Sequence, residues 1–236
     1  MTSELGRIAI VTGASRGLGL ATARALAGDG WSLVIDARNG DDLARAEAAI
    51  SMNTTVRAIT GDVADPEHRR RLVEAATSLG RLDLLVNNAS ILGLSPQPHL
   101  ADYPIDVLRE VYEVNVLAPL ALTQEAIPHL RSSSGVVINV TSDAAVEGYE
   151  GWGGYGSAKA ALNQISNILA AEEPEVSVYW LDPGDMNTRM HQEAFPGEDI
   201  SDRPDPETSV PALLALIESR PPSGHYRAEH LLTASR

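Results

Sequence analysis

Short apolar, β-branched runs alternate with amphipathic stretches along most of this 236-residue chain, and this alternation is the feature that most constrains its fold. Strands are expected at residues 8–11, 33–35, 56–60, 82–86, 136–140 and 176–181. Helices are expected between them, ending near residue 26 and spanning about 41–50, 66–78, 105–130 and 155–171. The fourth helix should bend at Pro119. Because such repeats require right-handed crossovers, the sequence predicts a doubly wound α/β fold, a parallel sheet with helices on both faces.

Length and composition favour a single domain spanning residues 1–236, since this length supplies one sizeable core. Residues 196–208 are rich in proline and acid and interrupt the pattern. They are either a surface loop or part of a mobile substrate lid around residues 185–210. The net charge of −14 argues against a nucleic-acid partner. The apolar runs are shorter than a membrane span and residues 1–6 carry no leader pattern, so a cytoplasmic protein without a membrane partner is expected.

Metal and thiol chemistry find no support in the sequence. The chain has no cysteine, which excludes disulfides and thiolate ligands, and its six histidines lack ligand spacing. No metal site is therefore expected. His191 could contact a substrate, although an exposed loop histidine is the more common case.

A glycine-rich segment at residues 12–19 joins the first expected strand to the first expected helix. Glycines there allow the backbone to approach a pyrophosphate, whose charge the free amides of the helix start would stabilise. Elsewhere such glycines are usually a tight turn, but at this position they favour a dinucleotide site. The residues expected to form it are Gly13, Ser15, Arg16, Gly17, Leu18 and Gly19.

Tyr155 and Lys159 stand four residues apart, so on a helix they share one face. A phenol has an ordinary pKa of about 10, and an ammonium held beside it favours the phenolate and lowers that pKa. The pair therefore predicts a proton-transfer group active near neutral pH. The same spacing also occurs by chance on solvated helices, and it gains weight only from the motifs upstream.

Five motifs together resemble the short-chain dehydrogenase/reductase family over roughly residues 7–190: the glycine loop, Asn87-Asn88-Ala89, Asn115, Ser142 and Tyr155-x-x-x-Lys159. The resemblance implies a Rossmann-type sheet of about seven strands, an NAD(P)(H) cofactor, and reversible hydride transfer between the nicotinamide and a carbonyl or alcohol. It implies that Tyr155 is the general acid in reduction, that Lys159 biases its ionisation and holds the nicotinamide ribose, and that Ser142 donates a hydrogen bond to the substrate oxygen. Asn115 would steady a water chain from Lys159 to solvent.

The resemblance also extends the cofactor site. Asp62 and Val63 resemble the adenine-binding pair, although an aspartate before valine also commonly ends a strand. Asn88 and Ala89 would line the ribose, followed by Ser90 where the family usually has glycine. The segment flanking the nicotinamide would contain Pro183, Gly184 and Thr188.

Arg38 favours NADP(H) as the preferred cofactor. In the family's register the position of an NAD-selecting acid falls on Ala37, and Arg38 follows it. Together with Arg16, Arg38 would pair the 2′-phosphate of NADP through charge-assisted hydrogen bonds. Asp36 loosely fits the simpler rule of a ribose-binding acid and could repel that phosphate, so NAD(H) stays possible. The alternative for Arg38 is a solvated residue starting a loop.

In similar proteins, residues 143–154 and the segment after Gly184 form the substrate walls. The expected substrate contacts are Ser142, Glu147, Trp152, Asp185 and Met186, with Met190 nearby. Glycines around Trp152 would let it move over a ligand, or it could pack between helices. The acidic groups disfavour an anionic substrate.

The sequence therefore predicts an NADP-dependent ketone reductase or alcohol dehydrogenase acting on a small molecule. A non-catalytic dinucleotide-sensing regulator and a sugar-nucleotide epimerase are the alternatives; the intact Ser142, Tyr155 and Lys159 argue against the first, and the chain length against the second. An apolar face with Ala161, Ile165 and Leu169 predicts a homodimer. A tetramer is possible, but residues 223–232 depart from the family's C-terminal pattern.

Overall fold

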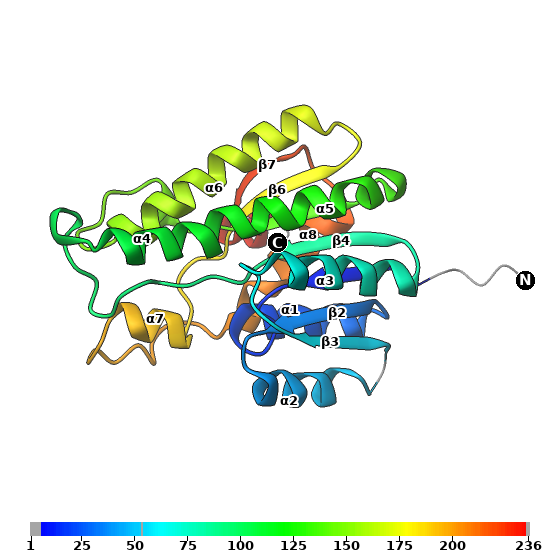
Figure 1. Cartoon of the computed structure of the whole chain (residues 1–236), viewed down its shortest axis with the longest axis horizontal. Helices are drawn as coiled ribbons and strands as arrows, with labels where there is room; N and C mark the ends of the chain where they lie inside the picture. The colour runs from blue at the N-terminus through cyan, green and yellow to red at the C-terminus, as the bar shows by residue number, and fades with distance from the viewer. Residues whose placement is uncertain (1–5, 53, 235–236) are drawn as a thin grey trace, which may run out of the picture.

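A computed structural model describes residues 6–52 and 54–234 and contains one seven-stranded parallel sheet with helices on both faces (Figure 1). The predicted doubly wound α/β fold is confirmed. The expectation about a leader rests largely on residues 1–5, which lie outside the described residues. The strands are β1 Ile8–Val11, β2 Ser32–Ala37, β3 Val56–Thr60, β4 Leu82–Asn87, β5 Val136–Val140, β6 Ser177–Asp182 and β7 Gly224–Arg227.

The α-helices of the described residues are α1 Gly17–Gly28, α2 Gly40–Ile50, α3 Pro66–Leu79, α4 Ile105–Tyr112, α5 Ala118–Ser133, α6 Gly153–Glu172, α7 Arg189–Ala194, α8 Val210–Ser219 and α9 Ala228–Ala234. Short helical turns lie at Leu100–Asp102, Glu113–Leu117, Asp143–Ala145 and Pro206–Thr208. No helix in the described part of the chain is long and apolar enough to cross a membrane.

Two apolar layers sandwich the sheet, because successive side chains of each strand point to opposite faces. On β1, Ala9 and Val11 pack with residues of α1, α2, α8 and α9. Ile8 and Ile10 pack on the other face with residues of α3 and α5. All four side chains of β1 are buried, as a central strand of a parallel sheet requires.

The strand order β3-β2-β1-β4-β5-β6-β7 reverses direction between β1 and β4. From β1 the chain builds outward through β2 to β3, and from β4 it builds the other way. Loops leaving the carboxyl ends of β1 and β4 therefore turn apart, which opens a crevice at this edge. The topology alone thus marks where a ligand would bind.

The expected helix at 105–130 is interrupted, and this corrects the prediction of one bent helix. α4 and α5 are separated by a π-helical turn at Glu113–Leu117, which contains the buried Asn115. Pro119 lacks the N–H that would reach the carbonyl of Asn115 in an α-helix, so the ladder is irregular just before it. The irregular turn lies at residues 113–117, just before Pro119, and separates two helices where one was expected.

The C-terminal segment completes the sheet although its sequence departs from the family pattern. β7 pairs in parallel with β6, from Tyr179 opposite Gly224 to Asp182 opposite Arg227. This strand was not among the six expected from residue pattern, because only Tyr226 within it is a strongly strand-favouring residue.

Candidate active site

A cavity of about 1340 Å³ lies at the carboxyl edge of the sheet. Most residues predicted for cofactor, catalysis and substrate line it: Gly13, Ser15, Arg16, Gly17, Leu18, Arg38, Asp62, Val63, Asn88, Ala89, Ser142, Trp152, Tyr155, Lys159, Pro183, Gly184, Asp185, Met186 and Thr188. Three predicted residues do not line it: Gly19, Asn115 and Glu147. Glu147 is exposed and does not line the cavity, so this structure does not place it with the other expected substrate contacts.

The glycine loop needs its glycines for two different reasons. Gly13 and Gly17 have φ values of 64° and 55°, which side chains disfavour. At Gly19 a Cβ would lie 2.5 Å from the Gly13 carbonyl oxygen, so this residue permits a close approach within the loop and does not face the cavity. The first turn of α1 has no side-chain cap and no acidic residue, which leaves its amides able to bind an anion.

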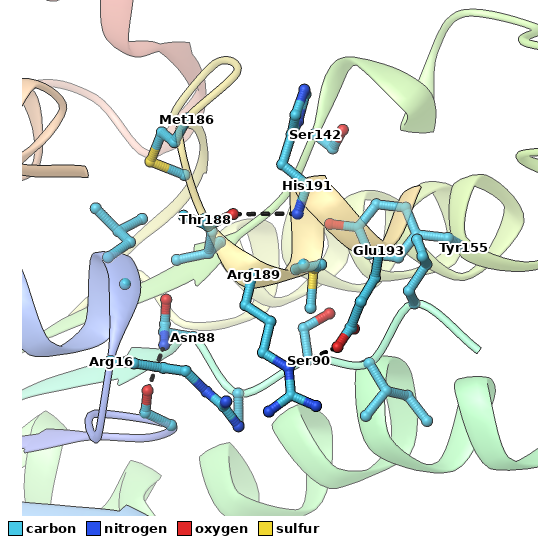
Figure 2. Close-up of a pocket in the computed structure, with 18 of the residues that line it drawn as sticks. Arg16, Asn88, Ser90, Ser142, Tyr155, Met186, Thr188, Arg189, His191 and Glu193 are labelled. Atoms are coloured by element: carbon cyan, nitrogen blue, oxygen red, sulfur yellow. Dashed lines mark hydrogen bonds and ion pairs between the residues drawn. The ribbon is translucent and has the colours of Figure 1, made fainter. Parts of the chain in front are cut away.

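Asn88 fixes the glycine loop to the end of β4. Its side-chain amide donates to the carbonyl oxygens of Thr12 and Gly13, at 2.8 and 3.2 Å. The Thr12 hydroxyl accepts from the backbone N–H groups of Asn88 and Ala89, at 3.0 Å each. Figure 2 shows Asn88 pointing at the loop beneath the open space of the cleft. In this structure the side chain of Asn88 holds the glycine loop in place, and its contact with the cofactor ribose stays a prediction.

Asp36 is occupied by the protein itself. Its carboxylate accepts from the Gly13 N–H at 2.7 Å and lies 2.8 Å from Nε2 of His68. Asp36 and His68 are 1% and 0% exposed. Asp36 thus supports the turn of the glycine loop through its carboxylate. It borders the cavity together with Arg16 and Arg38, and the two arginines are exposed.

Tyr155 and Lys159 are both buried on α6. Hydrogen bonds from polar side chains of the sheet fix the position of this helix relative to β4 and β5. Asn87 on β4 donates to Asn139 on β5, and Asn139 donates to the Ser166 hydroxyl of α6, each at 2.8 Å. Lys159 Nζ donates to the Val140 carbonyl at 2.8 Å and lies 5.4 Å from the centroid of the Tyr155 ring. The end of β5 thus positions the ammonium near the phenol.

The expected lowering of the Tyr155 pKa by Lys159 is not found. Burial raises the pKa of Tyr155 above its ordinary value, with smaller contributions from neighbouring groups. Burial also lowers the pKa of Lys159 to about 7. Desolvation penalises both charged forms, and it outweighs the attraction between groups that share no hydrogen bond. Tyr155 is consequently protonated at neutral pH, which is the form that can donate a proton.

Ser142 and Asn115 are placed by the hydrogen bonds of their own loops. The Ser142 hydroxyl donates to Asp143 Oδ1 at 3.0 Å and accepts from the Ala144 N–H at 3.2 Å. Asn115 Nδ2 donates to the Ile91 carbonyl at 2.8 Å, and its Oδ1 accepts from the Ile91 N–H at 2.9 Å. Ser142 borders the cavity, while the side chain of Asn115 braces the loop after β4 from behind.

Trp152 packs into an aromatic wall of the cleft. Its ring centroid lies 5.8 Å from that of Tyr155 and 5.9 Å from that of Phe195. The glycines predicted to let it move serve packing instead, because a Cβ at Gly153 would meet Leu100 and one at Gly154 would meet Tyr103. Trp152 therefore joins α6 to the segment after α7 and still faces the cavity.

His191 is not the exposed loop residue that the sequence favoured. It lies on α7, which Thr188 caps by accepting from the His191 N–H at 3.2 Å (Figure 2). Its side chain is 10% exposed, and burial lowers its pKa. Nε2 is buried without a hydrogen-bond partner, while the residue lines the cavity.

Sequence reasoning missed Phe195 and the functional potential of Ser90, both of which line the cavity. The Thr188 cap followed by Met190 and His191 was a detectable signal for a short helix beside the cleft. Ser90 was noticed only as a departure from a pattern. Among the described residues, no group of three or more acidic or histidine side chains is placed to hold a metal ion.

Comparisons with known proteins agree with this geometry. The family model for short chain dehydrogenases matches residues 7–199. An uncharacterised oxidoreductase of Methylorubrum extorquens is 33% identical over 239 residues, which cover 93% of this chain and 94% of that protein. The rhamnolipids biosynthesis 3-oxoacyl-[acyl-carrier-protein] reductase of Pseudomonas aeruginosa is 36% identical, over 80% of this chain and 76% of its own.

Among solved structures, a short chain dehydrogenase from Shigella flexneri in complex with NADP superposes with a TM-score of 0.87. It is 28% identical, over 94% of this chain and 97% of that one.

Proposed function

The chain belongs to the short-chain dehydrogenase family and is a Rossmann-fold oxidoreductase, and from this premise we propose that it reduces a small ketone, or oxidises the matching alcohol, with NADP(H). One observation carries the proposal: the buried Tyr155, with Lys159 Nζ 5.4 Å from its ring centroid, lines the same cavity as the uncapped start of α1. A phosphate site and a proton donor thus share one crevice, at the edge where the strand order reverses between β1 and β4.

The cavity residues fit a dinucleotide. Gly17, Leu18 and the start of α1 would hold the pyrophosphate, and Asp62 with Val63 would hold the adenine. Pro183, Gly184 and Thr188 border the opposite end, where the nicotinamide would lie. The bound cofactor supplies or accepts the hydride.

Proton transfer belongs to the protein. In reduction Tyr155 gives its hydroxyl proton to the carbonyl oxygen as negative charge develops there. Lys159, held by Val140, places a cationic or dipolar N–H group near the phenol and toward the ribose side of the cleft. Ser142 would turn its proton from Asp143 to the substrate oxygen, since Asp143 also accepts from the Ala144 N–H. Asn115 would keep its water-chain role only through its backbone, because its side chain is committed to Ile91.

NADP(H) is the cofactor that the charges favour. The exposed Arg16 and Arg38 line the cavity, and the carboxylate of Asp36, which also borders it, is occupied by the Gly13 N–H and by His68. A similar structure is a complex with NADP. Steady-state kinetics should give a kcat/KM for NADPH at least tenfold above that for NADH, and Arg38→Ala should remove most of this preference. A preference for NADH in the unaltered protein contradicts the assignment.

The substrate side of the cavity favours a neutral carbonyl compound. Asp143 and Asp185 face this side, and the nearby Arg189 is paired with Glu193 at 2.7 Å. A similar protein is named a 3-oxoacyl-[acyl-carrier-protein] reductase, so an acyl thioester is the informative competitor. A panel of neutral ketones, keto acids and a 3-oxoacyl thioester should give the best kcat/KM with neutral ketones; faster reduction of the thioester contradicts this choice.

Tyr155→Phe is the direct test of the mechanism. The variant keeps the ring and its contact with Trp152 but cannot donate a proton, so NADPH oxidation with a ketone should fall by at least about a hundredfold. NADPH affinity, followed by fluorescence, should change little. Wild-type turnover in this variant contradicts the role of Tyr155. Tight NADPH binding by the unaltered protein without turnover of any ketone would instead favour a dinucleotide-sensing regulator.

Three further expectations accompany this function. The segment around residues 185–210 serves as a substrate lid on the single domain. The protein is cytoplasmic, and it acts as a homodimer. Ala161 and Ile165 pack partly against the neighbouring Val111 and Val116, so the outward apolar face of α6 is smaller than expected. Ile168 remains 46% exposed. Light scattering on the protein should give twice the monomer mass, and a monomer at micromolar concentration contradicts the dimer.

A further inference from the structure

Ser90 lies at the first turn of the loop after β4, between Tyr155 and the buried Asn115. It lines the cavity, and its hydroxyl donates to Asn115 Oδ1 at 3.1 Å. Figure 2 shows Ser90 beneath Tyr155, whose ring extends from α6 toward the middle of the cleft. Ser90 lowers the pKa of Tyr155 through its hydroxyl, against the larger opposing effect of burial. None of the roles described above uses this contact.

The direction of these hydrogen bonds follows from Asn115. Its Nδ2 donates to the Ile91 carbonyl at 2.8 Å, which identifies the other side-chain atom as the oxygen, an acceptor only. This Oδ1 accepts from the Ile91 N–H and from Ser90. A serine hydroxyl has one proton, so while Ser90 donates to Asn115 its lone pairs face Tyr155. The neutral Tyr155 hydroxyl is then the donor to Ser90.

The arrangement changes once Tyr155 has lost its proton. A buried phenolate needs hydrogen-bond donors. In this structure Lys159 Nζ donates to the Val140 carbonyl and the Ser142 hydroxyl donates to Asp143, and neither donates to Tyr155. Ser90 can rotate its proton toward the phenolate without stranding Asn115, because Oδ1 keeps the Ile91 N–H at 2.9 Å. Asn115 is 0% exposed, so no rearrangement of solvent is required at its side.

We propose that Ser90 is a positioning residue for the reaction: it orients the Tyr155 hydroxyl and then turns its own proton from Asn115 to the phenolate. The inference rests on the proposed function, in which Tyr155 is the proton donor. During reduction the Tyr155 O–H bond breaks and an O–H bond forms on the former carbonyl oxygen. The Ser90 proton stays on Ser90 throughout, and only its hydrogen-bond acceptor changes. Alcohol oxidation runs the same exchange in reverse.

Ser90→Ala and Ser90→Thr separate this role from simple packing. Alanine removes the hydroxyl, whereas threonine keeps it. Oxidation requires the deprotonated Tyr155, so in Ser90→Ala the apparent pKa of kcat/KM for alcohol oxidation should rise by about one unit. Activity below that pKa should fall about tenfold and recover at higher pH. Ser90→Thr should keep the wild-type profile, and NADP affinity should be unchanged in both variants.

Two outcomes overturn the proposal: a Ser90→Ala profile that coincides with the wild-type one, even if its rate is uniformly lower, or a Ser90→Thr profile shifted as far as that of Ser90→Ala. The tyrosinate absorbance of the NADP complex, taken as the difference from a Tyr155→Phe variant, gives the same pKa without turnover. Failure of the proposed function is recognised separately, because Tyr155→Phe would then be as active as the unaltered protein.

Discussion

At the scale of single residues, burial decides what the polar groups of this site can do. Tyr155 and Lys159 are 7% and 2% exposed, and both are held away from their charged forms. Asp36 is buried as well, but it has two hydrogen-bond partners and serves the glycine loop. The same residue types on a solvated surface would carry ordinary charges and none of this chemistry.

The lowered pKa of Lys159 predicts a pH-dependent stability. Between about 7 and the ordinary 10.5, the unfolded chain binds a proton at Lys159 that the folded chain does not. Stability therefore rises with pH across this window. Lys159→Met removes the effect, so between pH 7 and 9.5 the unaltered protein should gain up to about 3 kcal/mol relative to the variant. Urea unfolding at the two pH values measures this, and a constant difference contradicts the lowered pKa.

At the scale of elements, α6 works because it lies unusually close to its neighbours. A Cβ at Gly156 would lie 2.5 Å from the carbonyl oxygen of Ala144, in the short turn Asp143–Ala145. Gly154 makes room for the ring of Tyr103 in the same way. These contacts, with the Asn87–Asn139–Ser166 hydrogen bonds, fix Tyr155 relative to Ser142.

Gly156→Ala should therefore disturb the site directly. The added methyl group must push α6 away from Ala144, which should destabilise the protein by about 1–3 kcal/mol and lower kcat. Gly28→Ala is the matched control, since it also lies in a helix but a Cβ there meets nothing within 4 Å. The control should be neutral or slightly stabilising. Thermal melting and NADPH oxidation of both variants test this, and equal behaviour of the two would contradict the close-packing argument.

At the scale of the whole molecule, the seven strands form one sheet whose two halves meet at β1 and β4. Neither half has a complete core alone, because the layer on one face joins α1 and α2 to α8 and α9. The chain should consequently unfold as one unit.

Trp31 precedes β2 and Trp180 lies on β6, so the two report on opposite halves. Variants that keep only one of them, with phenylalanine at the other and at Trp152, should show fluorescence transitions at the same urea concentration. Circular dichroism of both variants supplies the reference. Two separate transitions would indicate that residues 1–236 do not behave as a single domain.

The sequence by itself determined six of the seven strands, most of the helices and most of the residues that line the cavity. Strand and helix periodicity is a local property, and the loops that follow parallel strands must meet at one edge. The position of Gly17 between the first strand and the first helix therefore assigned it to this edge, and the family resemblance assigned Tyr155, Lys159 and Thr188 to the same crevice; all four line the cavity.

Only the tertiary structure decided the environment of each group. Neighbours distant in sequence decide three features of the site. They decide whether Asp36 contacts a ribose or the glycine loop, whether the pKa of Tyr155 is raised or lowered, and which atom accepts from Ser90. Periodicity carries no information about these contacts. The packing of the helices on the sheet determines the hydrogen-bond partners of each buried polar group. The same packing removes water from the group and thereby shifts its pKa.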